Sequence, residues 1–233
     1  MSLSLESRPC GKVYLIKCSG RIVTGEESAV LQAAINRALM EFNRLVLDVS
    51  DVERVDSSGL GLLVRFLSHT RNHGGDLRLA APQNFFRSLL EMTKLSTIFR
   101  IYDSEEEAVI SFLKEPATQN PAAGKPGPLV LFVDQSPDLC AFVRSMLNRH
   151  GYEVLSTCRM RDARTLLSAA DVDYIVLGPE SSQLPSDNIA ASLKLLAPKA
   201  VTVQLETGFQ LGDPESASAE LLQRMQAGTG ASR

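Results

Sequence analysis

The sequence has no long hydrophobic run and no large surplus of charge of either sign. No window approaches eighteen consecutive apolar residues, and the first residues, MSLSLES, alternate apolar and polar side chains instead of forming the apolar core of a signal peptide. Lys and Arg together number 24 and Asp and Glu 27, so the net charge is −3 and no basic surplus is available to neutralise phosphates. We therefore expect a cytoplasmic protein that neither inserts into a membrane nor binds nucleic acid directly.

Cysteine and histidine are also scarce, with four and three residues respectively. The cysteines are Cys10, Cys18, Cys140 and Cys158, and no two of them have the C-x-x-C spacing typical of zinc sites. We expect neither a metal site nor a disulfide framework, and no cofactor. The cysteines are expected to be reduced and mostly buried.

The composition is that of a folded protein with two modest domains. Hydrophobic residues make up 44% of the 233 residues and charged residues 22%, values that exclude disordered and collagen-like chains. The clearest break is EPATQNPAAGKPGP, from Glu115 to Pro128, where Pro and Gly recur without a hydrophobic period. We predict a first domain over residues 1–115, a linker over 116–127 and a second domain over 128–233.

The first domain has the alternating pattern of an α/β fold. A strand-like segment over 12–18 precedes a helical apolar pattern over 31–42, and the apolar run Leu45–Val49 indicates a strand near the centre of a sheet. A loop is predicted over 50–55. Later segments predict strands over 77–80 and 98–102 and helices over 85–92 and 104–113.

The segment Asp56-Ser57-Ser58-Gly59 marks a turn from a strand into a helix. Asp and Ser side chains accept hydrogen bonds from the free N–H groups that open a helix, and a Gly-Gly pair at 74–75 is a stop signal. We predict a helix over Ser57–Asn72. Its expected core stripe is Leu60, Leu63, Val64 and Leu67, with Leu62 and Phe66 beside that stripe.

The second domain has four strand candidates separated by helical patterns. The strands are predicted over 129–134, 153–157, 174–177 and 200–205, and the helices over 138–149, 161–170, 187–196 and 216–225. This alternation predicts a parallel sheet wrapped by helices, without a clear fifth strand.

The segment DSSGLG at 56–61, with the strand and loop before it, resembles the STAS domain of bacterial anti-sigma factor antagonists. SGRI at 19–22 and FRIY at 99–102 match the same family in order, and the resemblance covers about residues 3–113. In that family a partner kinase phosphorylates the first Ser after the Asp, which corresponds to Ser57. The resemblance implies a partner-binding surface made of Asp56, Ser58, Gly59, Leu62, Phe66, Ile22, Val23 and Thr24. Val23 departs from the family, in which many members have a polar residue, and this change bears on which partner binds.

The expected position of Ser57 gives a physical reason for such a modification. A side chain at a helix N-terminus lies beside unpaired backbone N–H groups and the positive end of the helix dipole, so a phosphate is tolerated there. The added charge of about −1.5 to −2 would leave the fold intact and change what docks on the helix. The simpler alternative is that Asp56 and Ser57 only cap the helix.

Residues 128–205 resemble the receiver domain of response regulators, through VLFVD at 130–134, GYEV at 151–154 and DYIVL at 173–177. An active receiver has a phosphoacceptor Asp where this chain has Gly178, and an acidic pair of which only Asp134 remains. The Lys-Pro that follows a fifth strand is missing as well. Because one carboxylate is a poor magnesium site, we expect a doubly wound, flavodoxin-like pseudo-receiver without phosphotransfer chemistry.

Together the resemblances imply a regulatory protein of a bacterial partner-switching pathway, not an enzyme. The first domain, a STAS-type mixed sheet with helices, would bind an anti-sigma factor that is also a serine kinase, and a phosphatase would reverse the modification of Ser57. The second domain would offer a contact for a second protein, and a dimer is left open. The alternative is a STAS scaffold or a transport-accessory protein that binds its partner without a phosphorylation cycle.

Overall fold

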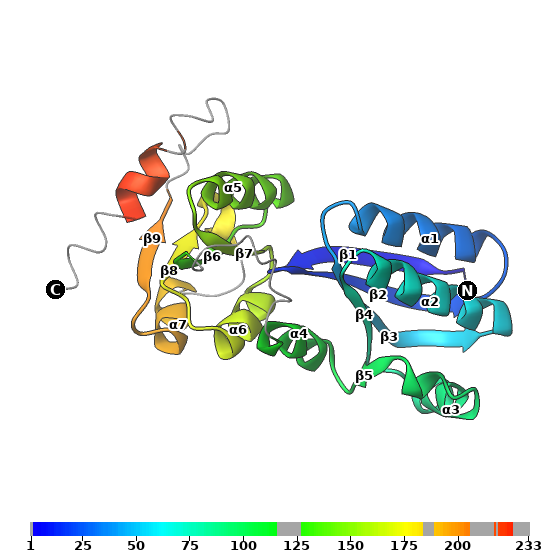
Figure 1. The fold of residues 1–233 in the computed structure, drawn as a ribbon. Helices are drawn as coiled ribbons and strands as arrows, with labels where there is room; N and C mark the ends of the chain where they lie inside the picture. The colour runs from blue at the N-terminus through cyan, green and yellow to red at the C-terminus, as the bar shows by residue number, and fades with distance from the viewer. Residues whose placement is uncertain (1, 116–126, 184–188, 206–216, 218, 226–233) are drawn as a thin grey trace. The chain divides into compact units, whose positions relative to one another are not determined.

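The chain divides into two compact units, residues 1–112 and 113–233, each of which is described separately. The computed structural model describes all residues except 1, 116–126, 184–188, 206–216, 218 and 226–233 (Figure 1). Nearly all of the predicted linker over 116–127 therefore lies outside the described residues.

The first unit is a five-stranded mixed sheet with helices. Its elements are β1 (Ser4–Cys10), β2 (Val13–Ile22), α1 (Glu26–Ala38), β3 (Arg44–Val55), α2 (Ser57–Asn72), β4 (Asp76–Ala80), α3 (Asn84–Met92), a 3-10 turn (Leu95–Thr97), β5 (Arg100–Tyr102) and α4 (Glu105–Lys114). The strand order is β5-β4-β3-β2-β1, with β1 antiparallel to β2 and the other neighbours parallel. This arrangement confirms the predicted α/β class and mixed sheet.

The predicted loop over 50–55 is wrong, because β3 continues through it to Val55. This half of β3 pairs with the end of β2, from Ser19 opposite Asp51 to Ile22 opposite Val55. Along it Val52 is buried while Asp51 and its other polar neighbours are exposed. A strand with one face in solvent has a polar composition that resembles a loop in the sequence.

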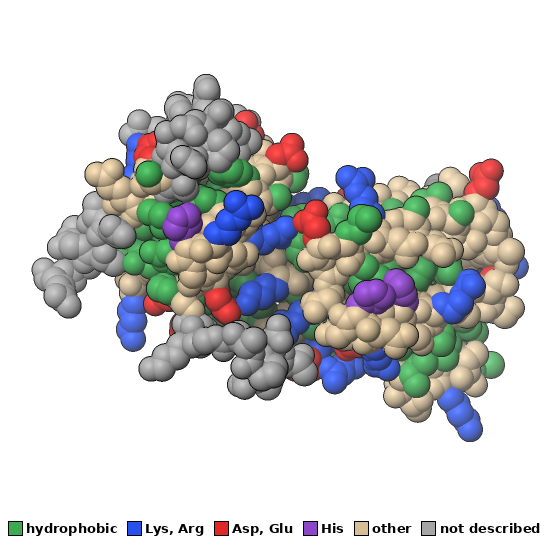
Figure 2. Space-filling view, turned by 45° about the horizontal axis from the view of Figure 1, so that its top comes forward, with side chains coloured by type: hydrophobic (Ala, Val, Ile, Leu, Met, Phe, Trp, Pro, Cys, Tyr) green, Lys and Arg blue, Asp and Glu red, His purple; other side chains and the backbone are tan. Residues whose placement is uncertain are grey.

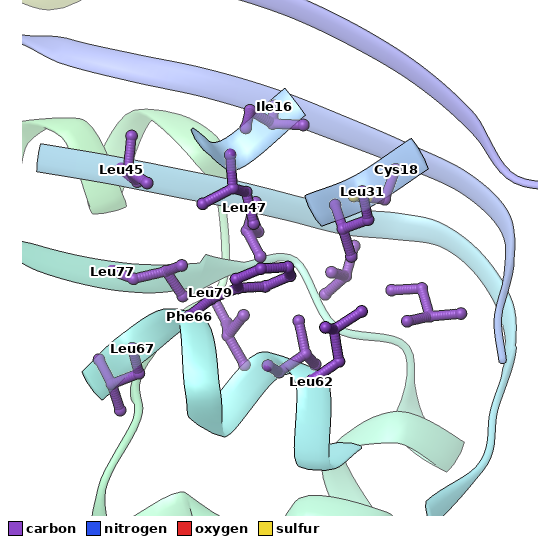
Figure 3. Close-up of a cluster of buried hydrophobic side chains, with 14 of the residues drawn as sticks. Ile16, Cys18, Leu31, Leu45, Leu47, Leu62, Phe66, Leu67, Leu77 and Leu79 are labelled. Atoms are coloured by element: carbon purple, nitrogen blue, oxygen red, sulfur yellow. The ribbon is translucent and has the colours of Figure 1, made fainter. Parts of the chain in front are cut away.

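The core of the first unit lies between the sheet and the helices that pack on it, and α2 contributes more side chains than predicted. Figure 3 shows Leu62, Phe66 and Leu67 of α2 close to Leu47, Leu77 and Leu79 of the sheet. The expected core residues Leu60, Leu63 and Leu67 are buried, whereas Val64 is only half-buried. Placing Leu62 and Phe66 beside the stripe was wrong, because this helix buries a stripe wider than four residues.

The second unit is a parallel sheet with helices on both faces (Figure 1). Its elements are β6 (Leu129–Val133), α5 (Pro137–Arg149), β7 (Glu153–Thr157), α6 (Met160–Ala169), β8 (Tyr174–Leu177), a 3-10 helix (Pro179–Gln183), α7 (Ile189–Leu196) and β9 (Val201–Gln204). The order β7-β6-β8-β9 of the described strands, all parallel, matches the order of the first four strands of a doubly wound flavodoxin-like sheet.

The chain after β9 is described only in part. Residues 219–225 are helical, within the helix predicted over 216–225, while 206–216 lie outside the described residues. No described residue after β9 belongs to a strand. The resemblance of this unit to a receiver domain stays a prediction.

Candidate functional site

Asp56 fixes the start of α2 and ties it to the loop that follows β2. It is the N-cap residue, and its Oδ1 accepts a hydrogen bond from the backbone N–H of Gly59 at 2.7 Å. Its Oδ2 accepts from the backbone N–H of Thr24 at 3.2 Å, and its own N–H donates to the carbonyl of Ile22 at 3.4 Å. The end of β2 and the first turn of α2 are thus held together by one carboxylate.

These hydrogen bonds also set the charge of the site. The pKa of Asp56 lies below its ordinary value, mainly because the N–H of Gly59 stabilises the carboxylate, with a further contribution from the N–H of Thr24. Asp56 is therefore ionised at neutral pH, directly beside Ser57 in the chain. A carboxylate at this place also interacts favourably with the positive end of the helix dipole.

Gly59 is required by a close approach of the backbone and not by an unusual backbone conformation. A Cβ at residue 59 would lie 2.1 Å from the carbonyl oxygen of Ile22, so the first turn of α2 rests directly on the end of β2. At Gly61, two residues further on, a Cβ would meet nothing within 4 Å. The two glycines of the motif therefore have different structural roles.

The two serines of the motif are exposed to solvent. Ser57 is the first residue of α2, and no acidic residue lies in the first turn of that helix itself. Asp56 is half-buried next to them, so the carboxylate borders the surface on which both hydroxyl groups lie. A hydroxyl at this position is accessible to another protein without any change in the core.

Several residues of the predicted partner surface have buried side chains. Ile22, Leu62 and Phe66 expose 0%, 2% and 4% of their surface, and Gly59 is buried as well. These side chains pack in the core, so assigning them to a partner-facing surface is not supported. The predicted residues that remain accessible are Asp56, Ser57 and Ser58, with Thr24 exposed and Val23 half-buried. The spacing of four residues puts Leu62 and Phe66 on one face of the helix, but it does not show that this face is buried.

The second unit holds one buried carboxylate at the end of β6. Asp134 is fully buried, and it accepts hydrogen bonds from the backbone N–H groups of Ser136 at 2.8 Å and Glu180 at 2.9 Å. Burial raises its pKa above the ordinary value, although both N–H donors act in the opposite direction. A Cβ on Gly178 would lie 2.2 Å from its Oδ2.

Metal-binding clusters, histidine pairs and membrane spans are further features that would bear on function among the described residues. No group of three or more His, Cys, Asp or Glu side chains among them could hold a metal ion. His69 and His73 have ring centroids 4.4 Å apart, and Nδ1 of His73 is hydrogen-bonded to the carbonyl of His69. Within the described part of the chain, no helix has the length and apolar character needed to cross a membrane. On the visible face, acidic and basic side chains are interspersed (Figure 2).

Comparisons with known proteins match part of the chain. An anti-sigma F factor antagonist of Paenibacillus polymyxa is 28% identical over 112 residues, which are 47% of this chain and 94% of that protein. A candidate anti-sigma factor antagonist of Thermotoga maritima is 37% identical over 68 residues, or 29% of this chain. The matched region spans 60% of the length of that Thermotoga protein.

A crystal structure of a candidate anti-sigma factor antagonist from Thermotoga maritima matches 46% of this chain and 92% of its own, with 26% identity and a TM-score of 0.41. The family model that matches the sequence is described as the STAS domain, and it covers residues 7–108. These residues include β2, β3 and the whole of α2 with its capped N-terminus. Residues 7–108 of this chain are therefore similar to the STAS domain family.

Proposed function

We propose that this protein is an anti-sigma factor antagonist whose binding to its partner is switched by phosphorylation of Ser57. The observation that carries the proposal is the exposed hydroxyl of Ser57 at the first position of a helix whose start is fixed by Asp56. The relatives named as anti-sigma factor antagonists support the kind of partner.

The reaction itself belongs to the partner kinase. The kinase transfers the γ-phosphoryl group of ATP to Oγ of Ser57, the hydroxyl proton leaves, and ADP is released. A phosphatase hydrolyses the ester again. The antagonist is thus the substrate of both enzymes, and its unphosphorylated form holds the anti-sigma factor so that the sigma factor is free.

Two opposing electrostatic effects act on a phosphate at Ser57. The helix N-terminus favours a negative charge, whereas the ionised carboxylate of Asp56 next to it disfavours one. Because Ser57 is exposed, the phosphate stays in water and its main effect falls on a partner that must cover it. The switch therefore acts at the interface and leaves the buried side chains of α2 in place.

The second unit is proposed to be a pseudo-receiver that contacts a second protein without accepting phosphate. Two features support this part of the proposal. Gly178 offers no carboxylate, and the oxygens of Asp134 are already engaged by the N–H groups of Ser136 and Glu180. We expect that acetyl phosphate with Mg²⁺ leaves this unit unmodified, and a hydroxylamine-sensitive phosphate on residues 128–233 would contradict it.

The competing function is that of a STAS scaffold or transport-accessory protein. The hydrogen bond from Gly59 to Asp56 supports this competing function, because helix capping alone is enough to explain an Asp-Ser pair at this position. Phosphopeptide mapping of the protein purified from its own cells separates the two functions. Phosphate on Ser57 in the wild type and in Ser58→Ala, with none in Ser57→Ala, is the expected result. Phosphate on Ser58 in place of Ser57 would contradict the assignment of the site, and no phosphate under conditions where the kinase is active would favour the scaffold.

A further inference from the structure

Two cysteines that are far apart in the sequence have neighbouring sulfur atoms in the second unit. Cys140 lies near the start of α5, Cys158 directly follows β7, and their Sγ atoms are 3.7 Å apart. Cys140 is buried, whereas Cys158 is half-buried and therefore open to small molecules. Both are free thiols in this structure.

The separation of the two sulfur atoms suits a bond between them. A disulfide has an S–S length of about 2.05 Å, so the two atoms need to approach by about 1.7 Å. The thiol of Cys140 also lies 3.6 Å from the carbonyl oxygen of Asp134 and 3.8 Å from that of Thr157, weak contacts that a small side-chain rotation breaks at low cost.

The surroundings give the two thiols different reactivities. The pKa of the Cys158 thiol is lowered, mainly by its hydrogen bond with Cys140, whereas the same contact raises the pKa of Cys140. The other charged groups around Cys158 are Asp134 and Asp162, which raise its pKa, and Arg159, which lowers it. Since a thiolate is the nucleophile, Cys158 is the attacking residue and Cys140 the resolving one.

Cys18 in the first unit differs from this pair in burial and in pKa. Cys10 and Cys18 are both buried, and burial raises the pKa of Cys18 to about 12. A buried thiol of high pKa is inert toward oxidants. Cys18 is therefore a matched control within the same chain.

From this geometry we infer that Cys140 and Cys158 form a reversible dithiol–disulfide site that reacts with hydroperoxides. The thiolate sulfur of Cys158 attacks one peroxide oxygen, the O–O bond breaks, and the leaving oxygen takes up a proton, which gives a sulfenic acid on Cys158. The sulfur of Cys140 then attacks the sulfenic sulfur, the S–O bond breaks, and water leaves with the proton of the Cys140 thiol. Two thiols have lost two electrons and two protons, and the peroxide has gained them.

The site lies where a modification can affect ligand binding by this unit. The carbonyls of Asp134 and Thr157 near Cys140 mark the carboxyl ends of β6 and β7, and doubly wound sheets bind their ligands at that edge. A disulfide would link the start of α5 to the end of β7 there. The oxidised form thus restrains the edge next to Asp134, where a receiver would instead be phosphorylated.

Peptide mapping of the full chain after one equivalent of hydrogen peroxide tests this site. The remaining thiols are alkylated and the protein is digested with trypsin without reductant. Trypsin cuts after Arg144 and Arg149, so Cys140 and Cys158 fall on separate peptides unless a disulfide joins them. The expected product is the linked pair of peptides, lighter than their sum by two hydrogens and separated again by dithiothreitol. Cys18→Ser should leave the link unchanged, and Cys158→Ser should abolish it.

Three results would overturn the inference. They are full alkylation of both cysteines after peroxide treatment, a stable sulfenic acid on Cys158 without the link, and a link that joins two chains through Cys158. The attacking role has its own test in the pH dependence of alkylation. Cys158 should react with a midpoint below the ordinary thiol pKa of about 8.5, and Cys140→Ala should raise that midpoint. A midpoint unchanged in Cys140→Ala would contradict the assigned roles.

Discussion

Gly178 and Asp134 are packed so closely that a Cβ on Gly178 would lie 2.2 Å from Oδ2 of Asp134. Gly178 follows β8 and Asp134 follows β6, and these two strands are parallel neighbours. The Asp134 carboxylate therefore fills the space beside residue 178. The buried carboxylate of Asp134 can lie there only because residue 178 is a glycine without a side chain.

Gly178→Ala should destabilise the second unit, because its methyl group overlaps Asp134. We expect a loss of about 1–3 kcal/mol in the free energy of unfolding, as is usual for overpacked cores. Asp134→Ala removes the two nearest atoms, Oδ2 and Cγ, and leaves only Cβ in contact, so the double variant should lose less than the sum of the single losses. Denaturant unfolding of all four proteins measures this coupling, and strict additivity would show that the two residues do not compete for space.

Gly59 and Gly61 should respond in opposite ways to alanine. At Gly59 the added Cβ would lie 2.1 Å from the Ile22 carbonyl oxygen, so Gly59→Ala must push α2 away from β2 and should cost about 1–3 kcal/mol. At Gly61 the Cβ meets nothing, and alanine stabilises a helix by about 1 kcal/mol relative to glycine. Thermal unfolding of the two variants side by side tests the pair. Equal effects would contradict the close approach at Gly59.

Asp56 should contribute a stability that disappears in acid. Its folded pKa is lowered, so the contribution is complete above the unfolded pKa of about 3.9 and is lost as the pH falls through the folded pKa. Asp56→Ala should lose the cap, about 1 kcal/mol at neutral pH. Asp56→Asn is the matched control, because asparagine caps a helix equally well but does not titrate. Unfolding curves at pH 7 and pH 3 measure both effects, and an acid response of Asp56→Asn equal to the wild type would refute the assignment.

Negative charge at Ser57 should be tolerated by the fold. Ser57 is exposed at a helix N-terminus, so Ser57→Asp should keep the thermal midpoint within a few degrees of the wild type. Leu62→Asp places the same charge in the core, where the side chain is 2% exposed, and should unfold the first unit. Calorimetry distinguishes the two cases. A Ser57→Asp protein that melts like Leu62→Asp would mean that phosphorylation breaks the fold instead of changing an interface.

The start and end of α2 could be predicted from local chemistry. An Asp cap before Ser57 and a Gly-Gly pair after the helix gave the bounds that the structure has, Ser57–Asn72. The second half of β3 could not be predicted, because only Val52 on its inner face is fully buried and the polar residues around it resemble a loop. Whether such a segment forms a strand depends on the neighbour with which it pairs, here the end of β2.

Long-range packing accounts for the other differences. The burial of Leu62 and Phe66 depends on how α2 lies on the sheet, which the helix period alone leaves open. The proximity of Cys140 and Cys158 had no signal in the sequence, since it arises only when β7 pairs with β6 and α5 packs beside them. The match to the STAS family lies in the first unit and includes the motif residues 56–59. It does not show which of these residues face solvent; the structure does.

The most direct test of the proposed switch is the affinity of the proposed partner kinase for this chain with and without phosphate on Ser57. The kinase is first identified as the one that modifies the purified chain with ATP, and the phosphorylated form is separated by ion exchange. Titration calorimetry in the presence of ADP then compares the affinity of the kinase for the phosphorylated and unphosphorylated forms. Ser58→Ala is the control, because it keeps Ser57. Phosphorylation is predicted to weaken binding by at least about tenfold, or about 1.4 kcal/mol, while the thermal midpoint of this chain changes by only a few degrees. Equal affinity of the two forms would contradict it.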